Sequence, residues 1–258
     1  MVIWQIFIQL VLRGTFALGL TLAMISPQLA AARFHGSCLG WLAGVNAAAA
    51  LLLVWQRSGF GNWPGIVGLT LAAAFAGGLT AARCRDSRSG AGTTGAWVVA
   101  MLAAVAALLA LPWRPPPSGF GVALAVTDLL SGGLLLGGIA AVVLLGNWYL
   151  QTPKIALVPW PLLVRLIAGG VAVRSVLCAV SLILQLVGHG LATRYWVFLG
   201  ARWACAVLAW ALVSWLARET RREPPAPTDV GRLFSGVLLT LVGEAAAQFV
   251  AVDALYPV

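Results

Sequence analysis

Long apolar stretches alternate along the chain with short polar segments, and this pattern predicts the fold. A helix of about 20 apolar residues crosses a bilayer, and most of the stretches approach or exceed that length. Lipid offers no hydrogen-bond partner to an exposed backbone, so the stretches must be helical. We predict an all-α polytopic transmembrane helix bundle, a single integral-membrane domain over 1–258. Its spans, about eight, lie near 3–26, 37–55, 65–82, 96–113, 119–147, 162–187, 196–217 and 232–252.

The composition excludes a water-soluble domain. Hydrophobic residues make up 61% of the 258 residues and charged residues only 9%, whereas soluble domains carry roughly 25% charged residues. The net charge of +9 would suggest a nucleic-acid partner in a soluble protein. Here the arginines cluster at helix ends, so we assign the charge to membrane orientation and expect no nucleic acid as partner.

Basic residues are unevenly shared between the connectors and predict an orientation. Connectors after odd-numbered spans hold Arg33, Arg83, Arg85, Arg88, Lys154, Arg218, Arg221, Arg222 and Arg232. Connectors after even-numbered spans hold only Arg57, Arg114 and Arg194. Because positively charged segments stay in the cytoplasm, we predict that both termini lie outside.

Five ionisable residues fall well inside predicted spans. Burying a charge in a bilayer costs at least a few kcal/mol, so such residues need partners or a function. The residues are Arg13, Asp128, Arg174, Arg202 and Glu244. Three interpretations stay open. The charges form pairs that fasten helices together, or they line a pocket in which a surplus guanidinium meets an anionic or carbonyl-bearing ligand, or Asp128 and Glu244 belong to a proton path.

The fifth span ends in the segment GNWYLQTP, residues 146–153. Trp148 and Tyr149 are typical anchors at a membrane interface. A second interpretation is a ligand site at the level of the lipid head groups, with Asn147 and Tyr149 as polar contacts. Prolines at 153, 159 and 161 predict that residues 153–161 are not regular helix.

This segment resembles a G-H-W-Y-L-x-x-P motif of multi-spanning bacterial membrane proteins of unknown function. Those proteins also carry a Gly-Glu pair in the last helix, in a segment similar to SGVLLTLVGEAAAQF, where the pair is Gly243-Glu244. The resemblance implies a multi-pass protein of the bacterial inner (plasma) membrane. Asn147 departs from the motif's histidine: asparagine keeps hydrogen bonding but does not titrate near neutral pH.

Small and aromatic residues in the spans predict packing surfaces. Two glycine pairs, Gly132-Gly133 and Gly137-Gly138, allow another helix to approach closely. We assign them to packing within the bundle, with a dimer seam as the alternative. Trp196, Trp203 and Trp210 repeat every seven residues and form one stripe on a helix, which we assign to packing or lipid contact.

Histidines and cysteines are few, and we expect neither haem nor a metal site. The predicted orientation places His35 and His189 on opposite sides of the membrane, so they cannot share an iron. The four cysteines are scattered without a CxxC pair, which predicts no disulfide framework. We expect no covalently bound cofactor; a quinone or a lipid is the ligand that a buried polar pocket would take.

Three functions follow as hypotheses. The first is an integral-membrane subunit of a larger bacterial complex, without a catalytic centre of its own, whose partners are the lipid bilayer and other membrane subunits. The second is a secondary transporter or proton-coupled permease that uses Asp128 and Glu244; a faint similarity between residues 19–33 and 68–83 supports it, since transporters often contain repeats. The third, an intramembrane enzyme acting on lipid, has no motif in its favour.

Overall fold

The computed structural model describes residues 2–25, 32–55, 62–86, 91–111, 119–151, 160–188, 193–219 and 227–251. Apart from a few residues at helix ends, these segments are helical, and no strand occurs among them. The eight helices are α1 (Val2–Met24), α2 (Ala32–Trp55), α3 (Trp63–Asp86), α4 (Ala91–Leu109), α5 (Gly119–Gln151), α6 (Trp160–Gly188), α7 (Thr193–Glu219) and α8 (Pro227–Ala251). The predicted all-α fold is confirmed.

Seven helices are long and apolar enough to cross a membrane. These are α1 to α7, and α5 has the highest hydropathy of them. In α8 the apolar part is Phe234–Val250, which is shorter than the about 20 residues of an average span. Multi-pass insertion in a bilayer is therefore supported by length and composition, with α8 as the shortest apolar helix.

Several helices begin before the predicted spans, and α2 and α6 are two examples with different causes. The first turn of α2 begins at Ala32 and contains Phe34 and His35, both fully buried. α6 begins at Trp160, so the prediction that residues 160 and 161 lie outside regular helix was wrong. Proline is tolerated in the first helical turn, where its missing N–H has no intrahelical partner to lose, and Pro161 occupies such a position.

The helices group into two compact units. Unit 1 comprises residues 1–111 and 147–160, and unit 2 comprises residues 112–146 and 161–258. Thus α1 to α4 belong to unit 1 and α6 to α8 to unit 2, and the division falls within α5.

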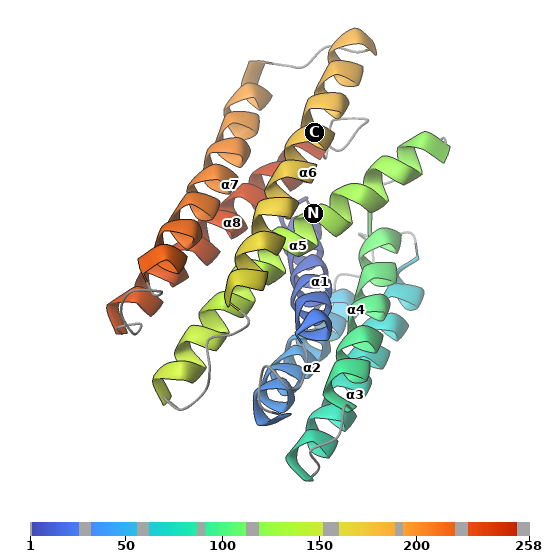
Figure 1. The fold of residues 1–258 in the computed structure, drawn as a ribbon. Helices are drawn as coiled ribbons and strands as arrows, with labels where there is room; N and C mark the ends of the chain where they lie inside the picture. Colours follow the sequence, from blue (N-terminus) through green and yellow to red (C-terminus); the bar gives the residue numbers. More distant parts are fainter. Residues whose placement is uncertain are drawn as a thin grey trace. The chain divides into compact units, whose positions relative to one another are not determined.

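In unit 1, α2 packs against α3 and α1 packs against α4, while α3 also contacts α4 (Figure 1). Small residues allow these close approaches. A Cβ added to Gly77 of α3 would lie 3.1 Å from the carbonyl oxygen of Leu39 in α2, and one added to Gly19 of α1 would lie 3.2 Å from Ala100 of α4. Helices in lipid associate through such contacts because apolar side chains gain little by leaving lipid.

The last turn of α5 belongs to unit 1 and carries the start of the GNWYLQTP segment. The Trp148 ring contacts Phe34 of α2 edge to face, with centroids 5.8 Å apart. Asn147 is exposed, while Pro153 lies outside the described residues. The contact with Phe34 gives the Trp148 ring a packing role within unit 1. A ligand site at this segment stays a prediction.

In unit 2, α7 packs along α8 (Figure 1), and α5 meets α6 through glycine. A Cβ on Gly170 of α6 would lie 3.1 Å from the backbone nitrogen of Leu135 in α5. A Cβ on Gly138 of α5 would lie 2.7 Å from Ile167 in α6. One member of each glycine pair of α5, Gly132 and Gly138, therefore faces a neighbouring element of the same unit.

Candidate functional site

Each helix of unit 2 contributes one buried charged residue to a single cluster. Asp128 lies on α5, Arg174 on α6, Arg202 on α7 and Glu244 on α8. All four side chains are almost completely buried, with residue exposures of 3–4%. We call these residues the four-charge network. The structure thus brings together four of the five ionisable residues that the sequence singled out.

Asp128 is shared by the two arginines. Its Oδ1 accepts a hydrogen bond of 2.9 Å from Nη2 of Arg202 and lies 3.6 Å from Nη1 of Arg174. The same Nη1 donates to the backbone carbonyl oxygen of Asp128 at 3.2 Å. Because arginine offers donors in a planar fork, Arg174 contacts both the side chain and the backbone of Asp128.

Arg174 also forms an ion pair with Glu244, through Nη2 and Oε1. The network therefore runs in the order Arg202, Asp128, Arg174, Glu244, and crosses from α7 through α5 and α6 to α8. Its two cations and two carboxylates sum to zero charge. This balance explains how four ionisable groups can lie inside apolar helices, since buried charges there require partners.

Two glycines make room for the network. A Cβ on Gly132 of α5 would meet Nη1 of Arg174 and would lie 3.2 Å from Oε1 of Glu244. A Cβ on Gly243 of α8 would lie 3.2 Å from the Cβ of Cys205 and 3.5 Å from the carbonyl oxygen of Arg202. The Gly243-Glu244 pair thus has a physical account. The glycine brings α8 against α7 beside Arg202, and the glutamate pairs with Arg174.

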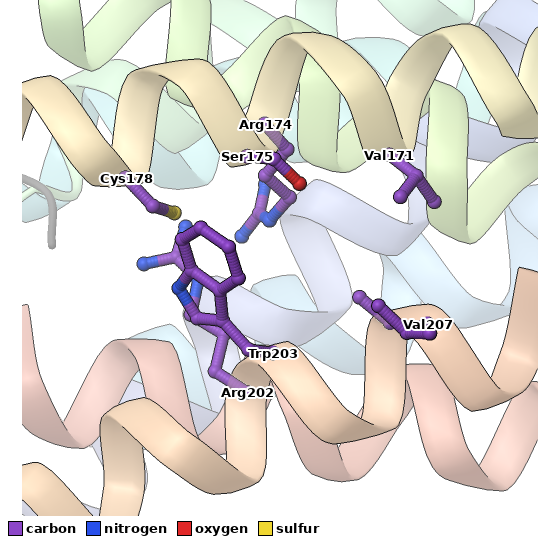
Figure 2. Close-up of a pocket in the computed structure, with 8 residues that line it drawn as sticks. Val171, Arg174, Ser175, Cys178, Arg202, Trp203 and Val207 are labelled. Carbon is purple, nitrogen blue, oxygen red and sulfur yellow. The ribbon is translucent and has the colours of Figure 1, made fainter.

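A cleft between α6 and α7 reaches two members of the network (Figure 2). Figure 2 shows Arg174 and Cys178 extending from α6 towards α7, and Arg202 and Trp203 extending from α7 towards α6. The lining residues are Val171, Arg174, Ser175, Cys178, Arg202, Trp203, Ala206 and Val207. The cleft encloses about 20 Å³, which is room for about one water-sized group.

Sequence reasoning missed the residues that line this cleft beside the arginines. A signal was present on each helix, because residues three and four apart share a helix face. Val171 and Cys178 flank Arg174 on α6 in this way, and Ala206 follows Arg202 on α7. That these two faces meet could not be read from either helix alone.

Arg13 is placed differently from the other predicted site residues. It lies on α1 in unit 1 and is buried, with 6% exposure. A role for Arg13 in a ligand pocket stays a prediction.

His35 connects the start of α2 to the end of α1 through its ring nitrogen. Its Nε2 lies 3.2 Å from the carbonyl oxygen of Leu22 and 3.1 Å from that of Ile25. As a donor, it contacts carbonyl groups at the end of α1, where the last turn leaves carbonyl groups short of partners. The Leu22 carbonyl also accepts from the backbone nitrogen of Ile25 at 3.2 Å. His189 lies outside the described residues. Within the described parts of the chain, no group of three or more His, Cys, Asp or Glu side chains is placed to hold a metal ion.

Comparison with known proteins gives no relative. No protein-family model, curated protein or solved structure matches the chain. The functional argument therefore depends on the chemistry of the network and the cleft.

Proposed function

We propose that the chain is an integral-membrane subunit of a larger bacterial membrane complex, and that it binds a quinone or a lipid in the α6–α7 cleft. One observation carries this proposal. Two buried guanidinium groups, from Arg174 and Arg202, line a cleft whose other walls are formed mostly by apolar side chains. An amphiphile with an oxygen-rich head and an apolar body matches such walls.

The surface around the cleft favours a ligand that arrives through lipid. Large apolar side chains near the cleft are exposed, among them Val176 of α6 at 64% and Leu208 of α7 at 54%. Exposed apolar patches of this kind mark contact with lipid or with another protein. Trp203, which lines the cleft, is itself partly exposed.

The short connectors favour a role inside a larger assembly. The longest segment between consecutive helices, residues 110–118, has nine residues. No connector is therefore large enough to fold into a catalytic domain of its own. These connectors leave the chemistry outside the bilayer to other parts of an assembly.

The test is extraction from the native membrane in mild detergent, followed by mass spectrometry of all bound proteins and small molecules. We expect co-purifying membrane subunits and a bound quinone or lipid in the wild type. We expect the ligand to be lost from Ala206→Leu, which fills the cleft, and to be retained by Ala204→Leu. Ala204 is exposed on the same helix and does not line the cleft. A solitary chain without ligand would refute the proposal.

A proton-coupled permease is the alternative that a specific observation favours. Asp128 and Glu244 are both buried and are linked through Arg174, so protonation of either carboxylate would release an arginine contact. Proton-coupled uptake into proteoliposomes that is abolished by Asp128→Asn and by Glu244→Gln would establish this function. The faint repeat adds little to it, because Gly19 packs against Ala100 whereas the matching Gly68 has open space around it.

A further inference from the structure

We infer that the ligand of the α6–α7 cleft is electrically neutral and presents a carbonyl oxygen to Arg174 and Arg202, as a quinone does. This inference rests on the proposed function and narrows it. Of the two ligand classes named there, it selects the neutral carbonyl compound over a lipid with an anionic head group.

The charge balance of the network is the first argument. Arg174 and Arg202 are compensated by Asp128 and Glu244, so the four groups sum to zero. An anionic ligand would add one negative charge in excess to this neutral set of four groups. An uncompensated charge within the bilayer costs at least a few kcal/mol. A carbonyl oxygen accepts hydrogen bonds and leaves the balance unchanged.

The depth of the cleft is the second argument. Arg174 lies 14 residues from each end of α6, Trp160–Gly188. At a rise of 1.5 Å per residue it is about 21 Å from either end of the helix. It also falls near the centre of the apolar span Leu162–Leu184. The phosphate of a bilayer lipid stays outside a hydrocarbon core of about 30 Å, whereas a neutral quinone ring can enter that core.

The available donors are the third argument. A guanidinium carries five N–H groups. Among the described residues, Arg174 contacts three oxygen atoms, namely the carbonyl oxygen and Oδ1 of Asp128 and Oε1 of Glu244. Donor capacity therefore remains for one more acceptor. The space of about 20 Å³ beside it admits one ligand oxygen atom, the size of a water molecule.

The apolar residues of the cleft suit the apolar part of a ligand that inserts only its carbonyl oxygen between the arginines. Val171 of α6 and Val207 of α7 lie at one end of the cleft, and the indole of Trp203 lies beside the arginines (Figure 2). Aromatic side chains pack favourably against other ring systems. In this orientation the carbonyl oxygen meets the two arginines, and the isoprenoid tail extends past the apolar residues into lipid.

The inference is tested by equilibrium dialysis of the purified full-length protein in non-ionic detergent against radiolabelled decyl-benzoquinone. Decyl phosphate, which has the same tail and an anionic head, is the competitor. We expect saturable binding of one quinone per chain and no competition by decyl phosphate. In Ala206→Leu we expect the affinity to fall by about tenfold or more, because the leucine side chain occupies the space that the ligand oxygen would take. Ala204→Leu should bind as the wild type does.

The possible failures are distinguishable. If decyl phosphate binds in a way that Ala206→Leu abolishes, and the quinone does not bind, the cleft is an anionic-lipid site and only the present inference falls. If neither probe binds, or if Ala206→Leu binds both as the wild type does, the cleft site of the proposed function falls as well. Ser175→Leu, which narrows the cleft from α6, replaces Ala206→Leu if that variant does not fold.

Discussion

Arg174 connects the two halves of the four-charge network, because it contacts Asp128 on one side and Glu244 on the other. A single side chain thus ties α6 to both α5 and α8. Arginine suits this position since its charge is permanent and its donors form a planar fork. Lysine, a compact point charge, would not contact both carboxylates with the same geometry.

Loss of the Glu244 charge is predicted to destabilise the protein. Glu244→Gln removes one carboxylate from a buried ion pair, and breaking such a pair costs about 3–5 kcal/mol. We expect the lower end of this range, because Arg174 keeps Asp128 as a partner. The measurement is the thermal midpoint in detergent. Glu219→Gln, at the exposed end of α7, is the control, and an equal loss in both variants would contradict the role of Glu244.

A double-mutant cycle on Asp128 and Arg202 is predicted to be strongly non-additive. Asp128→Asn and Arg202→Gln each leave a buried charge poorly compensated, whereas the double variant removes both charges of a pair joined at 2.9 Å. We expect the double variant to lose less stability than the sum of the two single variants, with a coupling of about 0.5–3 kcal/mol. Unfolding in a denaturing detergent series measures it; simple additivity would show that the pair contributes nothing.

At the scale of the helix, neighbouring glycines of α6 have different roles. Gly170 faces the backbone of α5, where an added Cβ would lie 3.1 Å from the nitrogen of Leu135 and 3.3 Å from the carbonyl oxygen of Ser131. Gly169 has no heavy atom within 4 Å of its added Cβ. The contact of α6 with α5 therefore depends on one member of the pair.

Gly170→Ala and Gly169→Ala are accordingly predicted to change stability in opposite directions. Overpacking against a backbone that cannot move aside should cost Gly170→Ala about 1–3 kcal/mol. Gly169→Ala should be neutral or stabilising by up to about 1 kcal/mol, because alanine is the better helix former. Thermal midpoints of the two variants in the same detergent decide this. A loss of the same size in both would show that helix propensity or lipid contact, and not the approach of α5, sets the effect.

At the scale of the whole molecule, the distribution of charge predicts how the chain lies in the membrane. The connectors after α1, α3, α5 and α7, taken together with the helix ends beside them, carry most of the basic residues. Our proposal that both termini are outside follows from this distribution. This orientation places the connector that contains Arg88 in the cytoplasm and the connector that contains Arg114 outside.

Reporter fusions test this orientation. Alkaline phosphatase is active only outside the cytoplasm, so a fusion after Arg88 should be inactive and a fusion after Arg114 should be active. Green fluorescent protein, which folds in the cytoplasm, should show the reverse at the same two positions. Activity of the phosphatase after Arg88 would invert the predicted orientation.

The sequence by itself determined the helices and the presence of buried charge. The length of an apolar stretch can be read locally from the sequence. In lipid, a single segment can satisfy its backbone hydrogen bonds only as a helix. The predicted spans therefore match α1 to α8 closely, apart from first turns such as that of α2, where Phe34 and His35 are buried by contacts that no local pattern reveals. Asp128, Arg174, Arg202 and Glu244 were equally visible, because any charge inside an apolar span is conspicuous.

Only the tertiary structure decided which charges meet. The pairing of Arg174 with Glu244 joins residues 70 positions apart, and it requires both Gly132 and a particular face of α6. The cleft between α6 and α7 likewise exists only where two helix faces come together. Such contacts depend on which helices become neighbours, and this is set by the packing of small residues over the whole unit. The hydrophobicity of a single segment does not encode that choice.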